Sequence, residues 1–340
     1  MSAFTPFLEK AASGYALSRA EMRAAMDIML TGGASEIEMA GFLMALRARG
    51  ETVDEIVAAA EAMRAAALKV PAPENAIDTC GTGGDNAGTY NVSTAAAFVA
   101  AGAGAQVAKH GNKAASSKSG STEVLEALGV KIDIGPDLIA RCIAEAGVGF
   151  MFAAAHHKAT ANVAPVRRAL GVRTLFNALG PLSNPAGARR QLMGVYSPDL
   201  VEPLARALLA LGAVRAWVVH GEDGIDELTT TGRSFVAEVI DGAVRTFTVT
   251  PEDAGLSEAS AAALKGGDPA ENADAMRRLL AGEKSAYRDI VIFNAAAALM
   301  VADRAADLKE GAAMAAASID EGRARAVLEK LIEISNGPAG

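Results

Sequence analysis

The sequence predicts an α/β protein with a small N-terminal helical domain and a large α/β domain whose mainly parallel central sheet is flanked by helices. Two observations support this fold class. Up to about residue 70, apolar residues recur at helical spacing and helix-start signals are frequent. From residue 76, short apolar runs alternate with helical segments, which is typical of a parallel sheet covered on both faces. A chain of 340 residues is long enough to hold both parts.

The helical part is defined by three capping boxes, in which a hydroxyl residue and a glutamate three positions later satisfy the first backbone N–H groups of a helix. They are Ser18 with Glu21, Ser35 with Glu38, and Thr52 with Glu55. Gly32, Gly33 and Gly50 are expected to end the helices that precede them. Pro71 and Pro73 then mark a linker to the second part.

The second part is expected to alternate strands and helices. Apolar runs predict strands at 76–80, 106–108, 130–134, 148–153, 191–196, 216–220, 235–240 and 244–249. Helical spacing predicts helices at 95–103, 121–128, 136–146 and 199–211, and an Ala-rich helical C-terminal third that is interrupted near Gly282 and Asp307. Asp241-Gly242 predicts a tight hairpin between the last two strands.

Residues 164–185 break this rhythm, and we expect them to cross back to the helical domain. The expected domains are therefore 1–72 with a returning segment at about 165–188, and an α/β domain made of 73–164 and 189–340. No internal repeat interrupts either domain.

Composition and charge exclude several classes of protein. The net charge of −8 argues against a nucleic-acid-binding surface. No apolar run is long and uncharged enough to cross a membrane. Cys80 and Cys142 give neither a disulfide framework nor a zinc pattern, so a reducing cytoplasm is the expected location.

The most informative segment runs from Gly81 to Thr94, between a predicted strand and a predicted helix. Its glycines let backbone N–H groups approach an anion, and the helix N-terminus adds the positive end of a dipole. Ser93 and Thr94 stand at that N-terminus, where hydroxyls cap a helix or hold a metal-bound phosphate. The segment predicts a phosphate-binding loop, and the alternative is a tight turn with Ser93 as an ordinary cap.

Two further loops follow predicted strands. The first reads Lys109-His110-Gly111-Asn112-Lys113 and is followed by Ser116, Ser117 and Ser121. Lysine charge and serine hydroxyls suit phosphate, and ligands of open parallel sheets bind outside the carboxyl ends of the strands. The second loop carries Asp226 and Glu227, and paired carboxylates suit Mg²⁺ that is shared with substrate phosphate. Each loop taken alone also fits a solvated polar turn.

Basic residues in the middle of the chain indicate a second substrate. His156-His157 has no third ligand at zinc spacing, so we expect one histidine to line a substrate pocket and the other to be structural. Arg167 could bind a carboxylate through its two-pronged guanidinium. Arg168 and Arg173 are expected to be solvated.

Together these motifs resemble the anthranilate phosphoribosyltransferases. They are Gly81-Thr82-Gly83-Gly84-Asp85, Asn91-Val92-Ser93-Thr94, Lys109-His110-Gly111-Asn112, Ser116-Ser117, Asp226-Glu227 and the stretch from Asn177 to Pro185. They occur in order over nearly the whole chain. The resemblance implies the fold shared with pyrimidine nucleoside phosphorylases and a homodimer formed through the helical domains. The sequence departs from the family pattern at Ala154 and at 158–161, on the acceptor side.

The resemblance also implies an activity, which is the transfer of the phosphoribosyl group of 5-phosphoribosyl-1-pyrophosphate (PRPP) to the amino nitrogen of anthranilate, with Mg²⁺ and release of pyrophosphate. To PRPP it assigns Gly81, Gly84, Asp85, Thr89, Asn91, Val92, Ser93, Thr94, Lys109, His110, Gly111, Asn112, Lys113, Ser116, Ser117 and Ser121. To anthranilate it assigns Gly81, Asn112, His157 and Arg167, and to two Mg²⁺ ions bound with PRPP it assigns Ser93, Asp226 and Glu227. Lys109, Asn112 and Arg167 would act in catalysis.

Two rival interpretations stay open. One is a nucleoside phosphorylase of the same fold, although the sequence from Lys109 to Asn112 speaks against it. The other is a non-catalytic homologue that binds phosphorylated ligands or nucleic acid, although the acidic charge and the Asp226-Glu227 pair speak against that. The expected partners are therefore PRPP and anthranilate, with no nucleic acid and no membrane.

Overall fold

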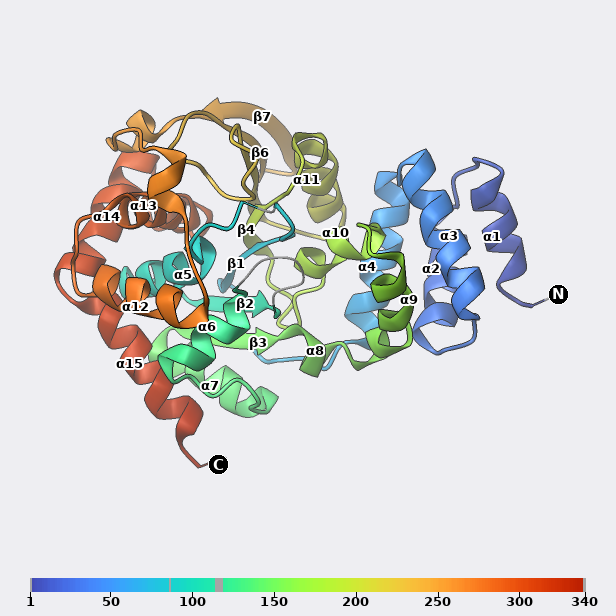
Figure 1. Ribbon diagram of the computed structural model, residues 1–340, viewed down its shortest axis with the longest axis horizontal. Helices are drawn as coiled ribbons and strands as arrows, with labels where there is room; N and C mark the ends of the chain where they lie inside the picture. Colours follow the sequence, from blue (N-terminus) through green and yellow to red (C-terminus); the bar gives the residue numbers. More distant parts are fainter. Residues whose placement is uncertain (1, 86, 114–118, 339–340) are drawn as a thin grey trace.

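The computed structural model describes residues 2–85, 87–113 and 119–338. Figure 1 shows helices α1 to α4 together on one side of the molecule and the sheet with its flanking helices on the other. Helix α10 lies beside α4 on the side that faces the sheet, whereas α9 lies within the helical part, where it contacts α3 (Figure 1). The predicted fold class is confirmed.

The helices and strands have the following bounds. The helices are α1 Thr5–Ala12, α2 Arg19–Leu30, α3 Glu36–Arg49, α4 Val53–Ala66, α5 Val92–Gly102, α6 Ser121–Leu128, α7 Pro136–Ala146, α8 Ala153–His156, α9 Ala164–Leu170, α10 Leu175–Leu182, α11 Val201–Ala210, α12 Pro269–Leu280, α13 Ala286–Val301, α14 Leu308–Asp320 and α15 Arg323–Asn336. The strands are β1 Ile77–Gly81, β2 Val107–Gly111, β3 Val148–Phe152, β4 Arg190–Gly194, β5 Arg215–Gly221, β6 Ser234–Ile240 and β7 Ala243–Val249. Short 3₁₀ turns lie at Lys158–Asn162, Pro198–Leu200, Pro251–Ala254 and Ala261–Leu264.

The sheet has the strand order β3-β2-β1-β4-β5-β6-β7. The first five strands are parallel, and β6 and β7 extend the sheet as an antiparallel hairpin. Asp241 and Gly242, at the tip of that hairpin, both have positive φ, as the predicted two-residue turn requires. The chain moves outward from β1 to β3 and then returns to β4 on the other side of β1, which makes the β1/β4 boundary a topological switch point.

Each face of the sheet carries its own core. Successive residues of a strand point to opposite faces, so Leu192 and Trp217 enter the core that holds α5, α13 and α15. Met193 and Val218 enter the opposite core. Helices α5 and α13 are apolar nearly all round because they are buried between the sheet and the outer helices.

The second core continues without a break from the sheet into the helical domain. Helix α11 covers β5 and β6, α4 packs against both α11 and α10, and α9 packs on α3. One apolar cluster therefore runs from Phe4, near the N-terminus, to Val239 in β6. The two helices after residue 164, α9 and α10, contact α3 and α4.

The three predicted capping boxes are all present, at Ser18, Ser35 and Thr52. The predicted strand at 130–134 is wrong, because that segment is irregular. Strands β2 and β3 pair with each other directly, which leaves no sheet position between them. The Lys131 N–H instead donates to Ser335 Oγ at 3.1 Å, while the apolar side chains of Val130 and Ile132 still enter the first core.

Two element boundaries also differ from expectation. Strand β2 extends to Gly111, so Lys109 and His110 stand within the strand and not in the loop after it. Helix α5 begins at Val92, so Ser93 and Thr94 lie inside its first turn, and Asn91 is the N-cap residue without a side-chain capping bond. No helix of the described residues is long and apolar enough to cross a membrane.

The buried side chain of Glu55 contributes to the stability of the helical domain through its hydrogen bonds. Its side chain is fully buried and accepts hydrogen bonds from the backbone of Leu17 at 2.9 Å and of Thr52 at 2.8 Å, and from Arg49. Burial alone would raise the pKa of Glu55, but these donors outweigh it and hold the pKa below its ordinary value. The ionised group therefore stabilises the fold above its unfolded-state pKa, and that contribution is lost as pH falls through the folded-state pKa.

We predict that Glu55→Gln lowers the free energy of unfolding by about 1–3 kcal/mol at neutral pH, because a charged acceptor of several donors is lost. The difference from the unmodified protein should begin to shrink as pH falls below the unfolded-state pKa of glutamate, about 4.3, and should be smallest at an acidic pH below the lowered folded-state pKa, where both side chains are neutral. Urea unfolding at the two pH values measures this. Glu36→Gln, an exposed first-turn change on α3, is the matched control and should stay within about 0.5 kcal/mol. An equal loss at both pH values for Glu55→Gln would contradict the role of the charge.

Candidate active site

The centre of the site is the switch point between β1 and β4. Gly81 ends β1 and pairs in register with Gly194, which ends β4. A Cβ on Gly81 would overlap Asp226 Oδ2, and a Cβ on Gly194 would overlap the backbone carbonyl of Asp226. Glycine at both positions therefore lets the loop after β5 lie directly over the carboxyl ends of β1 and β4.

The Gly-rich loop after β1 is attached to its surroundings at both ends. At its start, the Gly83 N–H donates to Asp226 Oδ2 at 2.7 Å, and Thr82 Oγ1 accepts from the Tyr196 N–H at 3.1 Å. At its end, Thr89 forms a β-bridge with Lys265, and the Gly266 N–H donates to the Gly88 carbonyl at 2.9 Å. These contacts fix the loop that the sequence predicted to bind phosphate.

Lys109 brings positive charge to the same place. Its side chain is buried, and its Nζ donates to the Thr79 carbonyl and lies 3.3 Å from Ser93 Oγ in the first turn of α5. Burial lowers the pKa of Lys109, while the negative charge of Asp78 opposes the shift. Asp78, also buried, accepts from the His110 N–H at 3.1 Å and from Asn184 Nδ2 at 2.7 Å, so it supports the strand that carries the lysine.

The acidic pair faces this lysine. Glu227 Oε1 accepts from the Ser93 N–H at 3.1 Å, and Asp226 is held against Gly83. Loss of hydration raises the pKa of both carboxyl groups, and the nearby charge of Asp85 raises that of Asp226 further. Carboxylates crowded in this way gain from a cation. Among the described residues, no group of three or more His, Cys, Asp or Glu side chains is placed to hold a metal ion.

The loop after β2 begins at the same edge. Asn112 is exposed, and its backbone carbonyl accepts from Ser121 Oγ at 3.3 Å at the start of α6. A Cβ on Gly111 would overlap that hydroxyl, so Gly111 allows α6 to begin beside the end of β2. Lys113 is exposed. Ser116 and Ser117, which the resemblance assigned to PRPP, lie outside the described residues.

Asn91 links the two loops. Its Oδ1 accepts from Ser119 Oγ at 3.3 Å and from Asn272 Nδ2, in α12, at 2.9 Å. Val92 and Thr94, by contrast, are buried on the core side of α5. Their backbone lies in the first turn of the helix while their side chains enter the protein interior.

The predicted acceptor residues lie beside this centre. The His157 ring is buried against the His110 ring, with centroids 5.2 Å apart. Burial lowers the pKa of His110 to about 3 and that of His157 to about 4, so both are neutral at pH 7. The Nδ1–H of His156 donates to the Leu68 carbonyl at 2.8 Å, which is a structural contact. The expected division of the histidine pair stays a prediction.

Arg167 is half-buried on α9, with its guanidinium 5.5 Å from the centroid of the Phe176 ring. Among the described residues, no hydrogen bond or ion pair joins Arg167 to Gly81 or Asn112. Direct hydrogen bonds thus join the Gly-rich loop and the first turn of α5 to the acidic pair, whereas the Arg167 guanidinium contacts the Phe176 ring.

The expectation that Arg173 is solvated is wrong. Its guanidinium donates to the Gly84 carbonyl and lies over the Tyr196 ring, 4.1 Å from the centroid. No local pattern could have revealed this, because the two partners come from segments remote from Arg173 in the sequence. Arg168, in agreement with expectation, is exposed.

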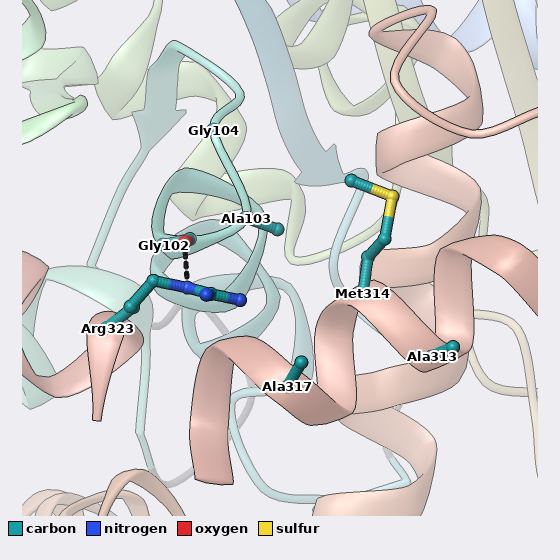
Figure 2. Close-up of a pocket in the computed structure, with 7 residues that line it drawn as sticks. All are labelled: Gly102, Ala103, Gly104, Ala313, Met314, Ala317 and Arg323. Atoms are coloured by element: carbon teal, nitrogen blue, oxygen red, sulfur yellow. Dashed lines mark hydrogen bonds between the residues drawn. The ribbon is translucent and has the colours of Figure 1, made fainter. Parts of the chain in front are cut away.

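A separate hollow of about 530 Å³ lies behind α5, where Gly102 and Ala103 face Met314 and Ala317 of α14 (Figure 2). Its one charged lining residue is Arg323, which donates to the Gly102 carbonyl at 3.0 Å. This hollow holds none of the carboxylates or phosphate-loop residues described above, so the candidate site remains at the β1/β4 switch point.

Comparison with known proteins gives the same two-part division. The family profile described as the helical bundle domain of a glycosyl transferase family matches residues 5–67. The profile described as the a/b domain of the same family matches residues 73–325.

Comparison with individual proteins identifies the activity class within this family. The chain is 59% identical over 329 residues to anthranilate phosphoribosyltransferase of a Chelativorans species, covering 97% of each chain. The anthranilate phosphoribosyltransferase of Thermus thermophilus superposes with a TM-score of 0.93 at 46% identity, over 97% of this chain and 99% of that one. The Saccharomyces cerevisiae enzyme in complex with PRPP and Mg superposes with a TM-score of 0.90 at 28% identity, over 98% and 97%. With its fold and full length matched in this way, the chain belongs to the anthranilate phosphoribosyltransferase family.

Proposed function

We propose that this protein transfers the phosphoribosyl group of PRPP to the amino nitrogen of anthranilate, giving N-(5-phosphoribosyl)anthranilate and pyrophosphate. This is the second step of tryptophan biosynthesis from chorismate, carried out by a Mg²⁺-dependent pentosyltransferase. The observation that carries the proposal is the meeting of the Gly-rich loop, Lys109 and the Asp226-Glu227 pair at one sheet edge, in a chain that matches the family over its full length.

PRPP is assigned to the two loops after β1 and β2. Backbone N–H groups of the Gly-rich loop and the N-terminus of α5 suit its phosphate oxygens. The buried ammonium of Lys109, next to the first turn of α5, would offset the charge of the pyrophosphate as it leaves. The full set proposed for PRPP is Gly81, Gly84, Asp85, Thr89, Asn91, Val92, Ser93, Thr94, Lys109, His110, Gly111, Asn112, Lys113, Ser116, Ser117 and Ser121.

The acidic pair fits Mg²⁺, because both carboxyl groups have raised pKa values and hard oxygen ligands are what this ion prefers. We propose that Ser93, Asp226 and Glu227 would hold two Mg²⁺ ions, which would bind together with PRPP. When bound, the metal supplies charge neutralisation of the pyrophosphate leaving group. The two protein carboxylates fix where that charge is neutralised.

Anthranilate is assigned to Gly81, Asn112, His157 and Arg167. Arg167 would orient the acceptor by binding its carboxylate with two parallel N–H groups. Burial lowers the pKa of Arg167, which reflects a guanidinium that has given up much of its hydration and gains from an anionic partner. The His157 ring, which is neutral at pH 7, would line the acceptor pocket with an uncharged surface.

The chemistry needs little beyond position and charge. The C1–O bond of PRPP breaks with its electron pair on pyrophosphate, and the lone pair of the anthranilate nitrogen forms the new C1–N bond with release of one proton. An aniline nitrogen is unprotonated at neutral pH, so no strong general base is required. Lys109, Asn112 and Arg167 would therefore act by holding the reacting groups and stabilising charge.

We also propose that the protein is a homodimer joined through its helical domains, with domain limits at 1–72 plus about 165–188, and 73–164 plus 189–340. Ile37 and Met44 support this, because both are exposed apolar side chains two turns apart on one helix, α3. A cytoplasmic location is supported by the two cysteines, which are free and buried.

The first test is anthranilate fluorescence in the presence of the protein, PRPP and Mg²⁺, with each component omitted in turn. Loss of fluorescence only in the complete mixture is the expected result. Retained fluorescence, with PRPP binding still seen by calorimetry, would point to another acceptor or to a homologue that binds PRPP without turnover. Phosphorolysis of uridine or thymidine would instead identify a nucleoside phosphorylase.

Arg167→Ala should raise the KM for anthranilate about 10- to 100-fold and change the KM for PRPP about twofold or less, because a charge-assisted contact to the acceptor alone is lost. Steady-state kinetics with each substrate varied measures both constants. Arg168→Ala, the exposed neighbour, is the matched control and should leave both unchanged. Equal increases of the two KM values for Arg167→Ala would remove the assigned role.

The double variant Asp226→Asn with Glu227→Gln should raise the Mg²⁺ concentration that gives half-maximal activity by about tenfold or more, because two charged ligands become neutral. The amide oxygen of the first substitution can still accept from Gly83, so the loop contact is kept. Asp223→Asn is the control, because Asp223 is a carboxylate of the same loop that is not assigned to the metal. Its Oδ2 accepts from the hydroxyls of Thr229 and Thr231 at 2.8 Å each, so the Mg²⁺ dependence should stay as in the unmodified protein. An unaltered Mg²⁺ profile in the double variant would disprove the metal assignment.

A further inference from the structure

The Gly-rich loop is held by a side chain that comes from the crossing segment. Arg173 lies just before α10, and its guanidinium donates to the Gly84 carbonyl. The same guanidinium lies over the Tyr196 ring, 4.1 Å from the ring centroid. Tyr196 also touches the loop itself, because its N–H donates to Thr82 Oγ1 at 3.1 Å. One arginine–tyrosine unit therefore contacts the loop at two points.

The backbone of Gly84 is fitted to this contact. Its φ is +78°, a value that residues with side chains rarely adopt. A Cβ at this position would also touch Arg173 Nε at 3.4 Å. Gly84 thus turns the chain so that its carbonyl faces the guanidinium, while the N–H of the preceding residue, Gly83, donates to Asp226 on the other side of the loop.

Arg173 is in turn fixed by the helical domain. Arg47, on α3, donates to the Arg173 carbonyl. A cavity of about 220 Å³ lies at this junction and is lined by Arg47, Glu51, Arg173 and Tyr196 together with residues of α10. A continuous line of contacts therefore leads from α3 through Arg173 to the loop at the carboxyl end of β1.

We propose that Arg173 is a positioning residue, which holds the Gly-rich loop in its anion-binding conformation and ties that conformation to the helical domain. The proposal deepens the proposed function and rests on it where it concerns PRPP. A loop fixed before the ligand arrives loses less conformational entropy on binding, so the ligand binds more tightly than to a free loop. The acceptor, assigned to other residues, gains nothing from this contact.

A direct contact between Arg173 and a phosphate is the competing explanation. A substitution at Tyr196 distinguishes the two explanations. Tyr196→Leu keeps the positive charge of Arg173 and removes only the aromatic ring over which the guanidinium lies. If Arg173 acts by position, loss of the ring should weaken PRPP binding in the same direction as Arg173→Ala, and the double variant should be no worse than Arg173→Ala alone. If Arg173 acts by direct charge contact, Tyr196→Leu should have no effect.

The experiment combines hydrogen exchange of the backbone amides of residues 82–85 in the ligand-free protein with calorimetric titration of PRPP in the presence of Mg²⁺. Arg173→Ala should exchange faster at these amides, raise the Kd for PRPP about tenfold, and leave the KM for anthranilate within about twofold. Arg173→Lys should recover only part of the loss, since an ammonium can donate to Gly84 but lacks the planar guanidinium. Arg168→Ala is the matched control and should behave as the unmodified protein.

Unchanged exchange in both Arg173→Ala and Tyr196→Leu overturns the proposal, as does a raised Kd in Arg173→Ala with no effect of Tyr196→Leu. Should Arg173→Ala fail to fold, Arg173→Lys and Tyr196→Leu carry the same comparison. An unmodified protein that does not bind PRPP would overturn the proposed function instead. The exchange measurement in the absence of ligand would still decide whether Arg173 holds the loop.

Discussion

The absence of side chains at Gly81 and Gly194 is the constraint on which the rest of the site depends. These two residues end adjacent parallel strands, and Asp226 occupies the space that their Cβ atoms would need. The close approach places the acidic pair over the strand ends, where Gly83 and the first turn of α5 can donate to it. With a side chain at either position, the loop after β5 could not lie directly over the ends of β1 and β4.

The site brings acidic side chains and a buried lysine close together. The charge of Asp85 raises the cost of ionising Asp226, and Asp226 in turn raises that of Glu227. The buried Lys109 lies close enough to Asp226 and Glu227 to interact with both charges. Buried carboxylates in such a cluster are costly to ionise without a counter-charge, and a divalent cation would lower that cost. The buried Asp78 keeps the lysine strand in place through the His110 N–H and Asn184.

Residues from distant parts of the chain contact the Gly-rich loop and hold it in place. Residues 264–266 pair with its end, Asn272 of α12 bonds to Asn91, and Tyr287 of α13 stacks on Tyr90 with centroids 4.3 Å apart. The crossing segment holds the beginning of the loop from the opposite side through Arg173. The C-terminal helices and the helical domain therefore act on the site through the loop, although neither supplies the acidic pair or the lysine.

The sequence alone determined what depends on neighbours in the chain. The capping boxes at Ser18, Ser35 and Thr52, the hairpin turn at Asp241 and the limits of α6 and α7 could all be predicted, because a few adjacent residues satisfy the backbone there. The Gly-rich loop and the acidic pair could be recognised in the sequence for the same reason, since each is a run of contiguous residues, and their binding roles stay predictions.

Only the tertiary structure decided what depends on a partner from elsewhere in the chain. Residues 130–134 carry a strand-like pattern, yet they form no strand because β2 and β3 already pair with each other. Lys109 looks like a loop residue but lies within a strand, because its ammonium finds the Thr79 carbonyl inside the protein. Arg173 looks like a solvated arginine and instead holds Gly84, because folding brings together two groups that the sequence keeps far apart.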